Sequence, residues 1–498
     1  MIILILALIL LLAAVYVFYY HYYWPYFQQR KLIGLNGPKP IPVFGNFFEL
    51  LKAGKHAPKC YDEWYQKYGP NYLVYMGIMP LIVTQDPEVI KDILVRKFDN
   101  FVDRTPDNAN LLKHILYANR ALSTITGDDW RQMRRMLSPG FNGKKLKLLT
   151  PIIELSCKQL VDALRKKVDT GVSEDVTESF DCFSMEVILM SIFGRKCNLH
   201  EGSDEMVAAV NAAFAETFGA LYAQEMALTF NSHVPFLSPF LQYILAHTSI
   251  AKQWIPVQDI AARIIQDRKD SGIRRSDIVQ YMLDTRDERN YQMTMLEMVS
   301  TAVLIILSGM GHNMTFMGHL LATHPEIQDR LIVDIKNYFV NNPDATLVDA
   351  AENIEYAEMV LQEVLRLFPA INMLSRYCSE TVTTSNGIVI PKGCQVYIPI
   401  YNIQRNPAFW PDPDKFDPER FGPNAKVPYN PATYITFGDG PRMCPGRQYS
   451  HIKIKMAMIS MLREFKFVKT KETDVPLPYD NIFQVTPLRH LKVAVVSI

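Results

Sequence analysis

The sequence predicts a large, mainly α-helical domain with small β-sheets, preceded by one transmembrane helix. Apolar residues recur at spacings of three and four from about residue 86 to 370, which is the period of helices that bury one face. Short strand-like runs occur within residues 72–84 and again after residue 388. The first 20 residues carry no charged side chain. These three observations decide the predicted fold class.

Residues 1–23 are expected to form an uncleaved membrane anchor. A helix of roughly 20 apolar residues spans a bilayer core of about 30 Å. The aromatic residues that follow, up to Trp24, suit the membrane interface, and the first basic residues, Arg30 and Lys31, come after them. This order places the rest of the chain in the cytosol. A cleaved signal peptide is the alternative, but its basic first region and small-residue cleavage site are not evident.

Residues 24–46 are expected to be a basic, proline-rich connector, and residues 47–498 a single catalytic domain. Pro38, Pro40 and Pro42 stiffen the connector, because proline fixes φ and disfavours a helix in the residue before it. No internal repeat or low-complexity tract is evident beyond this stretch. The connector would therefore hold the domain at a fixed attitude to the membrane.

The composition excludes several classes of function. The 498 residues carry a formal net charge of +1, so the chain as a whole has no attraction to nucleic acid. Its seven cysteines are scattered, without the paired spacings of a zinc site or a disulfide framework. Most of them are expected to be buried thiols in a reducing compartment.

One cysteine lies in a pattern that indicates chemistry. Gly438, Gly440 and Pro441 precede Cys444 and predict a tight loop whose backbone can approach a flat partner. Helical periodicity over residues 452–462 predicts a helix after the cysteine, whose amino end favours a thiolate. Such a loop suits a haem iron held by one thiolate, with a propionate on Arg442. The alternative is a structural cysteine in a turn.

At these residues the sequence resembles the cytochrome P-450 family, whose haem-binding loop reads Phe-x-x-Gly-x-Arg-x-Cys-x-Gly. Three further motifs lie in the order of the family: Trp130 with Arg134, Glu363 with Arg366, and Arg420 in a Pro-Glu-Arg-Phe segment. The resemblance runs from the connector to the last strand. It looks closest to the animal microsomal clan that includes drug-metabolising enzymes and thromboxane synthase.

The resemblance implies the cytochrome P-450 fold, haem b as cofactor, and Cys444 as the axial ligand of the haem iron. It also implies that a set of residues surrounds the haem, namely Arg104, Trp130, Arg134, Arg376, Phe437, Arg442 and Gly446. For Arg104 and Arg376 the alternative is an ordinary surface salt bridge. The Glu363, Arg366 and Arg420 group is expected to be scaffolding beneath the haem rather than catalytic.

The predicted distal helix departs from the family pattern. The family normally places an acid and a threonine there, which relay protons to bound dioxygen. Aligned on Ser308 and Gly309, the acid position is Gly311 and the alcohol position is His312. Counted back from His324, the pair falls on Ser308 and Gly309 instead. Neither register restores an acid followed by threonine.

Three functions remain open because of this departure. Ser308, His312 or Asn313, with an ordered water, could relay protons in a monooxygenase that inserts one oxygen atom from dioxygen into a lipophilic substrate. The alternative is a peroxide-rearranging isomerase or dehydratase of the same fold, a chemistry that often lacks the pair. A non-catalytic haem-binding protein is the third possibility. His312 could also simply face a neighbouring helix.

The remaining expectations concern substrate and partners. Residues 213–254, rich in Phe, Leu and Met, are expected to cover a pocket that a lipophilic substrate enters from the membrane, with residues 110–121, 370–374 and 482–485 as other walls. An acidic NADPH–cytochrome P-450 reductase is expected to dock on basic residues of the thiolate side. These are Arg131, Arg135, Lys144, Lys145, Lys147, Arg447, Lys453 and Lys455. The predicted location is the endoplasmic reticulum membrane, with one N-terminal anchor and a cytosolic catalytic domain.

Overall fold

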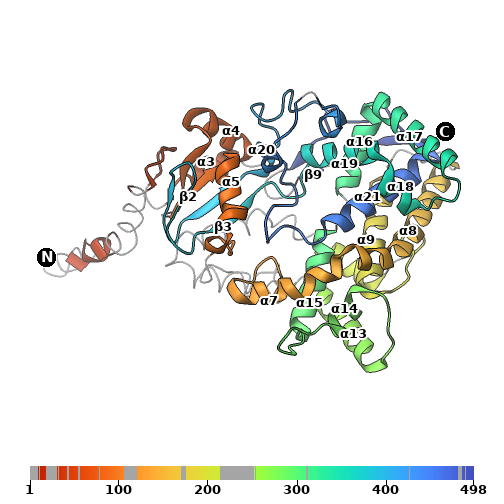
Figure 1. The fold of residues 1–498 in the computed structure, drawn as a ribbon, viewed down its shortest axis with the longest axis horizontal. Coiled ribbons are helices and arrows are strands. Elements are labelled where there is room, and N and C mark those ends of the chain that lie inside the picture. Colours follow the sequence, from red (N-terminus) through yellow and green to blue (C-terminus); the bar gives the residue numbers. More distant parts are fainter. Residues whose placement is uncertain are drawn as a thin grey trace.

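The computed structural model of the chain describes most of residues 31–498 and a few residues before them (Figure 1). The described residues are 9–10, 12–17, 19, 31, 33–41, 44–53, 57–77, 79–105, 120–169, 175–202, 204–213, 252, 254–309, 312–425, 427–480, 485–487 and 490–498. Most of the predicted anchor and most of three predicted pocket walls, at 110–121, 213–254 and 482–485, lie outside them.

A four-stranded sheet has the order β1-β2-β6-β3. Strands β1 (Asn71–Met76) and β2 (Met79–Thr84) form an antiparallel hairpin, in which Leu73 lies opposite Ile82. Strand β6 (Gln395–Ile398) pairs with β2 in parallel, and β3 (Leu374–Tyr377) pairs with β6 antiparallel. Three two-stranded ladders join β7 (Phe465–Lys469) to β10 (Val493–Ser497), β4 (Val382–Thr383) to β5 (Val389–Ile390), and β8 (Tyr479–Asp480) to β9 (Thr486–Pro487).

Helices make up most of the described chain. They are α3 (Phe47–Ala53), α4 (Ala57–Tyr68), α5 (Pro87–Lys91), α7 (Gly127–Leu137), α8 (Gly143–Asp169), α9 (Thr177–Phe193), α13 (Ile255–Ser271), α14 (Ile278–Asp284), α15 (Met295–Ser308), α16 (His312–Thr323), α17 (Pro325–Asn341), α18 (Leu347–Asn353), α19 (Glu355–Leu367), α20 (Ile400–Ile403) and α21 (Arg447–Leu462). Short helical turns are η3 (Asp92–Arg96), η4 (Phe98–Asn100), η7 (Ser138–Phe141), η9 (Pro418–Phe421) and η10 (Pro431–Thr433).

Two helices lie in the centre of the helical part, α9 and α21. Both are buried around most of their circumference, as expected of helices that carry apolar residues on all sides. Figure 1 shows α21 among α8, α9 and α18, while the four-stranded sheet and α3 to α5 gather on the side of the chain's beginning. The helix that follows Cys444 is therefore part of the main core, and the loop before it is held rigidly.

The helical span Met295–Thr323, which comprises α15 and α16, is the one part of the described chain that is long and apolar enough to cross a membrane. Half of its most apolar window is buried inside the protein, which explains the composition without a membrane. Helix α15 begins with a capping box, in which Thr294 accepts from the Glu297 amide and Glu297 accepts from the Thr294 amide.

The predicted fold class is confirmed for the domain: it is mainly helical with small sheets. The strand-like runs at 72–84, 388–390 and 396–400 coincide with β1, β2, β5 and β6, and the helix predicted after Cys444 is α21. Strand β10 coincides with the predicted run at 491–496, whereas β3, β4, β7, β8 and β9 are not predicted. The runs of β3 and β7 contain charged residues, so the sequence alone does not show that they are buried on one face.

Candidate functional site

The loop before α21 closes tightly around Cys444. Gly438 and Gly440 have φ of +75° and +68°, a conformation that residues with a side chain rarely adopt. A Cβ atom on Gly440 would lie 1.8 Å from the Leu94 carbonyl oxygen, so the loop packs directly against η3. The Cys444 amide donates to the Phe437 carbonyl over 2.9 Å. These constraints fix the direction of the Cys444 side chain.

The Cys444 thiol differs from the other cysteines in the charges that face it. Burial raises its pKa, while the backbone N–H groups of Gly446 and Arg447 and the guanidinium charges of Arg134 and Arg104 favour the thiolate and lower it. Because α21 begins at Arg447, those N–H groups belong to the start of a helix, where a negative charge is stabilised. Cys444 is the only one of the seven cysteines that two arginines face.

Four arginines gather on one side of this thiol: Arg104, Arg134, Arg376 and Arg442. Arg376 is 1% exposed and Arg442 is 6% exposed. Burial lowers the pKa of Arg442 to about 9, with a further lowering from Arg104 and Arg134 and an opposing effect of Asp103. Burial also lowers the pKa of Arg376, which the charges of Arg104 and Arg442 lower further. The arginines therefore repel one another in a poorly hydrated place.

The arginine cluster is short of negative charge. The closest recorded carboxylate is Asp103, whose Oδ1 lies 3.7 Å from Arg442 Nη2. The buried Nε atoms of Arg104, Arg376 and Arg442 have no hydrogen-bond partner among the described residues. A buried donor without an acceptor is costly, and a buried charge needs a counter-charge. An anion with several oxygens satisfies both needs, so the residues fit the two propionates of a haem.

Arg442 and Arg376 are held by neighbours that leave the Nε atom of each guanidinium without an acceptor among the described residues. Arg442 lies 4.5 Å from the ring centre of Trp130 and donates to the Ile125 carbonyl over 2.8 Å. Trp130 in turn packs against Phe98, with ring centres 5.6 Å apart. Arg376, on β3, donates to the Ser375 carbonyl over 2.8 Å.

The Arg104 backbone is tied to the sheet. Its carbonyl accepts from Ser375 Oγ over 2.7 Å and from Gln395 Nε2 over 3.2 Å. Residues from β3, β6, α7 and the loop before α21 thus meet at the arginine cluster beside the thiol. The contacts and charges described bring together the predicted residues Arg104, Trp130, Arg134, Arg376, Phe437, Arg442, Cys444 and Gly446.

The predicted ion pairs of the scaffold are confirmed. Glu363 and Arg366 are both 0% exposed, and two bonds join them, Nε to Oε2 over 2.6 Å and Nη2 to Oε1 over 2.9 Å. Arg420 Nε lies 3.2 Å from Glu363 Oε1, and the Asp417 amide donates to the same oxygen over 3.0 Å. The group joins α19 to η9. It forms because residues three apart on a helix lie on one face.

The distal residues are placed at the facing ends of α15 and α16. Ser308 is exposed, and its hydroxyl donates to the Leu304 carbonyl over 2.7 Å. His312 and Asn313 are half-buried at the start of α16. Burial lowers the pKa of His312 to about 4, so its ring is neutral near pH 7. No interaction recorded for the described residues joins Ser308, His312 or Asn313 to Cys444, and their catalytic role stays a prediction.

Two lysines predicted for the docking surface are instead buried, and this part of the prediction is wrong. Lys453 is 6% exposed and Lys455 is 7% exposed. Lys455 pairs with Glu358 over 2.8 Å, while Lys453 donates to the Gly309 carbonyl over 3.2 Å. The neighbouring apolar residues on all sides of α21 are the signal that could have revealed this burial. Arg135, Lys144, Lys145, Lys147 and Arg447 are exposed, and Arg131 is half-buried.

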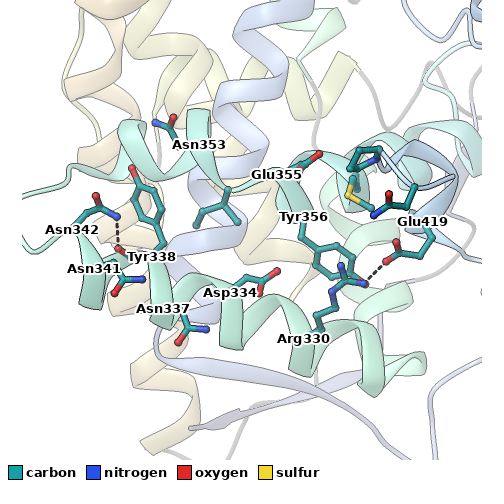
Figure 2. A pocket seen from close by; sticks show the side chains of 14 residues that line it. Arg330, Asp334, Asn337, Tyr338, Asn341, Asn342, Asn353, Glu355, Tyr356 and Glu419 are labelled. Carbon is teal, nitrogen blue, oxygen red and sulfur yellow. Dashed lines mark hydrogen bonds and ion pairs between the residues drawn. The ribbon is translucent and has the colours of Figure 1, made fainter.

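A polar pocket of about 440 Å³ lies away from this site, between α17, α19 and the segment after η9 (Figure 2). The guanidinium of Arg330 lies 3.8 Å from the ring centre of Tyr356 and pairs with Glu419. Arg330 and Glu419 are each about half exposed, so the pocket is a surface feature. None of the predicted site residues lines it.

Comparison with known proteins gives a consistent result. A family model described as Cytochrome P450 matches residues 35–493. Cytochrome P450 3A29 of Sus scrofa is 32% identical over 459 residues, which cover 90% of this chain and 88% of that protein. Cytochrome P450 3A6 of Oryctolagus cuniculus is 32% identical, covering 94% and 92%, and Cytochrome P450 3A27 of Oncorhynchus mykiss is 32% identical, covering 94% and 90%.

Proposed function

The chain belongs to the cytochrome P450 family, and we propose that it inserts one oxygen atom from dioxygen into a lipophilic substrate with electrons from NADPH. As a member of this family it is an oxidoreductase of the monooxygenase type that binds haem b and requires a small-molecule substrate and a redox partner. The observation that carries the proposal is the arginine cluster around Cys444, in which three buried Nε atoms lack an acceptor among the described residues.

In this proposal the Cys444 thiolate would bind the haem iron. Arg104, Arg134, Arg376 and Arg442 would hold the propionates, and Trp130 keeps the Arg442 guanidinium in place by stacking. The Phe437 carbonyl accepts from the Cys444 amide, and the Gly446 N–H faces the sulfur, so both would keep the side chain directed at the iron. When bound, haem b supplies the activation of dioxygen, and electron donation from a thiolate ligand favours cleavage of the O–O bond.

Proton delivery falls to residues near the end of α15 and the start of α16. A neutral imidazole donates at one nitrogen and accepts at the other, so His312 can pass on a proton at neutral pH without becoming a stable cation. Asn313 and Ser308 can orient a water between the ring and the substrate side. This route for the proton does not use the acid and threonine that the family usually has.

One observation favours the second candidate, a peroxide-rearranging isomerase or dehydratase. In the register counted from His324, Gly309 takes the alcohol position, and a Cβ there would lie 1.7 Å from Ile188 Cδ1. The preceding Ser308 hydroxyl is engaged with its own helix. Both positions thus lack a free acid or alcohol, which matters for dioxygen activation and not for rearrangement of a peroxide.

The proposed electron donor is an NADPH–cytochrome P-450 reductase that docks beside the thiolate loop. Five basic residues that the sequence placed there are exposed, namely Arg135, Lys144, Lys145, Lys147 and Arg447. Such a basic patch increases the association rate of an acidic partner, and the increase becomes smaller as the salt concentration rises. Lys453 and Lys455 have no part in this docking surface, because both are buried.

We also propose that residues 1–23 anchor the protein in the endoplasmic reticulum membrane, with residues 24–46 as connector and residues 47–498 as the cytosolic catalytic domain. Residues 12–17 are helical and exposed, with Leu12 59% and Tyr16 64% exposed. An apolar helix left exposed by its own protein is stabilised in a bilayer.

The test uses the purified full chain with a panel of sterols, fatty acids and lipid peroxides. One series contains NADPH, reductase and isotopically labelled dioxygen, and the other contains neither NADPH nor reductase. Label in a product of the first series is expected for a monooxygenase. Turnover of peroxides in the second series, with no labelled product in the first, would replace the proposal by the isomerase.

A ligand control accompanies this test. Cys444→Ala is expected to remove the red-shifted carbon monoxide band of the thiolate haem. Cys60→Ala, a half-buried cysteine that pairs with none of the arginines, is expected to leave the band in place. Survival of the band in Cys444→Ala would refute the ligand assignment.

A further inference from the structure

Lys453 is a buried cation that none of the roles above uses. It follows Cys444 by nine residues, on the helix that the thiolate loop begins. Among the described residues, no carboxylate forms an ion pair with it, in contrast to Lys455, whose partner is Glu358. Burial alone lowers the pKa of Lys453, to about 8. A lysine is rarely kept in such a place unless its ammonium group has a specific acceptor.

The acceptor of Lys453 is the carbonyl of Gly309, 3.2 Å from Nζ. Gly309 caps the C-terminus of α15, and its amide donates to the Ile306 carbonyl over 3.2 Å. The last four carbonyls of a helix lack partners within the helix and carry the negative end of its dipole. A lysine at that end both donates a hydrogen bond and is attracted by the dipole. Here the lysine comes from another helix, α21.

Gly309 has no side chain that could replace the family's alcohol. The Ile188 side chain of α9 occupies the space in which a Gly309 side chain would begin. The close packing of α15 on α9 therefore removes the alcohol from this position, and the Lys453 ammonium approaches the backbone of the same residue from α21. The Lys453 ammonium thus bonds the backbone of the residue at which, in one register, the family's alcohol is missing.

We propose that Lys453 is a positioning residue that holds the end of the distal helix in place by its bond to the Gly309 carbonyl. The bond links the helix that starts at the thiolate loop to Gly309, the residue that follows Ser308. Ser308 directly precedes Gly309 at the end of α15, so losing the bond changes how the Ser308 side chain meets the substrate side. The bond itself does not depend on the proposed function, but its effect on turnover does.

The experiment compares three variants of the haem-loaded full chain. Lys453→Met keeps the length of the side chain and removes all donors, Lys453→Gln keeps a donor, and Lys455→Met removes the neighbouring buried lysine as a matched control. Hydrogen–deuterium exchange is followed in the first turn of α16 and the last turn of α15. Loss of one charge-assisted hydrogen bond predicts exchange roughly tenfold or more faster in Lys453→Met. Lys453→Gln is expected to lie between Lys453→Met and the wild type.

The control and the spectra separate the possible failures. Lys455→Met is expected to speed exchange around Glu358 and to leave the ends of α15 and α16 unchanged. Lys453→Met is expected to keep the carbon monoxide band of the thiolate haem and to release more hydrogen peroxide per NADPH. Unchanged exchange in Lys453→Met, or equal acceleration in Lys455→Met, would overturn the inference. A wild type without the band would refute the proposed function instead, and the exchange comparison would still decide the role of Lys453.

Discussion

The buried Glu363 group allows a prediction whose magnitude follows from its contacts. Glu363→Gln keeps the shape of the side chain and removes its charge, while Arg366 stays 0% exposed. The two oxygens of Glu363 accept four hydrogen bonds, two from Arg366, one from Arg420 and one from the Asp417 amide. An amide nitrogen placed there faces N–H donors and cannot accept from them.

Breaking a buried ion pair by removing one partner costs about 3–5 kcal/mol, because the remaining charge stays buried without compensation. Since whole domains are stable by only about 5–15 kcal/mol, the Glu363→Gln change removes a large share of the stability. We expect the midpoint of urea unfolding, followed by circular dichroism of the haem-loaded protein, to fall sharply.

The control is Glu419→Gln, the same change in an ion pair with Arg330 in which both side chains are about half exposed. Exposed pairs contribute at most about 1 kcal/mol, so this variant is expected to unfold close to the wild type. Adding Arg366→Met to Glu363→Gln is expected to restore part of the lost stability, because it removes the stranded charge. If Glu363→Gln loses no more stability than Glu419→Gln, the Arg366 charge is compensated in the variant and the reasoning is wrong.

The remaining predictions concern single charged groups. Arg442→Met is expected to weaken haem retention roughly tenfold or more, measured as the haem-to-protein ratio after gel filtration. The control Arg447→Met, which changes an exposed arginine, is expected to retain haem. Equal retention in both variants would show that Arg442 does not hold a propionate. Burial raises the pKa of Glu358, but its bonds to His451 and Lys455 outweigh burial and lower it to about 2. The free energy of unfolding is therefore expected to fall as the pH is lowered from 4.5 to 2. If the Glu358→Gln variant lost the same amount of stability over this range, the prediction would be contradicted. Burial lowers the pKa of Lys453 from 10.5 to about 8, so the unfolded chain binds more protons between these values. The free energy of unfolding is expected to rise by about 3 kcal/mol from pH 8 to 10.5, and Lys453→Met should lose this rise; a rise that persists in the variant would refute it.

The parts of the site that the sequence could predict are those set by neighbours in the chain. The tight loop before Cys444 follows from Gly438 and Gly440, whose positive φ few other residues adopt. The bond between Glu363 and Arg366 follows from their spacing on one helix. In both cases the residues that meet are only a few positions apart in the chain, so their spacing in the sequence is enough to predict the contact.

Contacts between distant segments could not be predicted in this way. Arg442 donates to Ile125, which is 317 residues earlier in the chain. The apolar residues on all sides of α21 could have revealed the burial of Lys453, but not its partner, the Gly309 carbonyl, which is 144 residues earlier in the chain. The parallel pairing of β2 with β6 joins segments about 300 residues apart, and only the assembled fold sets their register.

The arginine cluster connects cofactor binding to the stability of the fold. Arg104 lowers the pKa of Arg376 and of Arg442 by repulsion, and Arg104, Arg376 and Arg442 each have a buried Nε without a partner among the described residues. These charges oppose folding until an anion is bound between them. A ligand that binds only the folded chain stabilises it in proportion to the logarithm of its concentration over its dissociation constant. The haem propionates would therefore contribute to folding at the same residues that orient the haem. It follows that replacing one arginine with a neutral side chain should destabilise the haem-loaded protein and, by relieving repulsion, stabilise the haem-free chain. This opposite sign distinguishes a ligand-binding cluster from a structural one, in which both forms would lose stability.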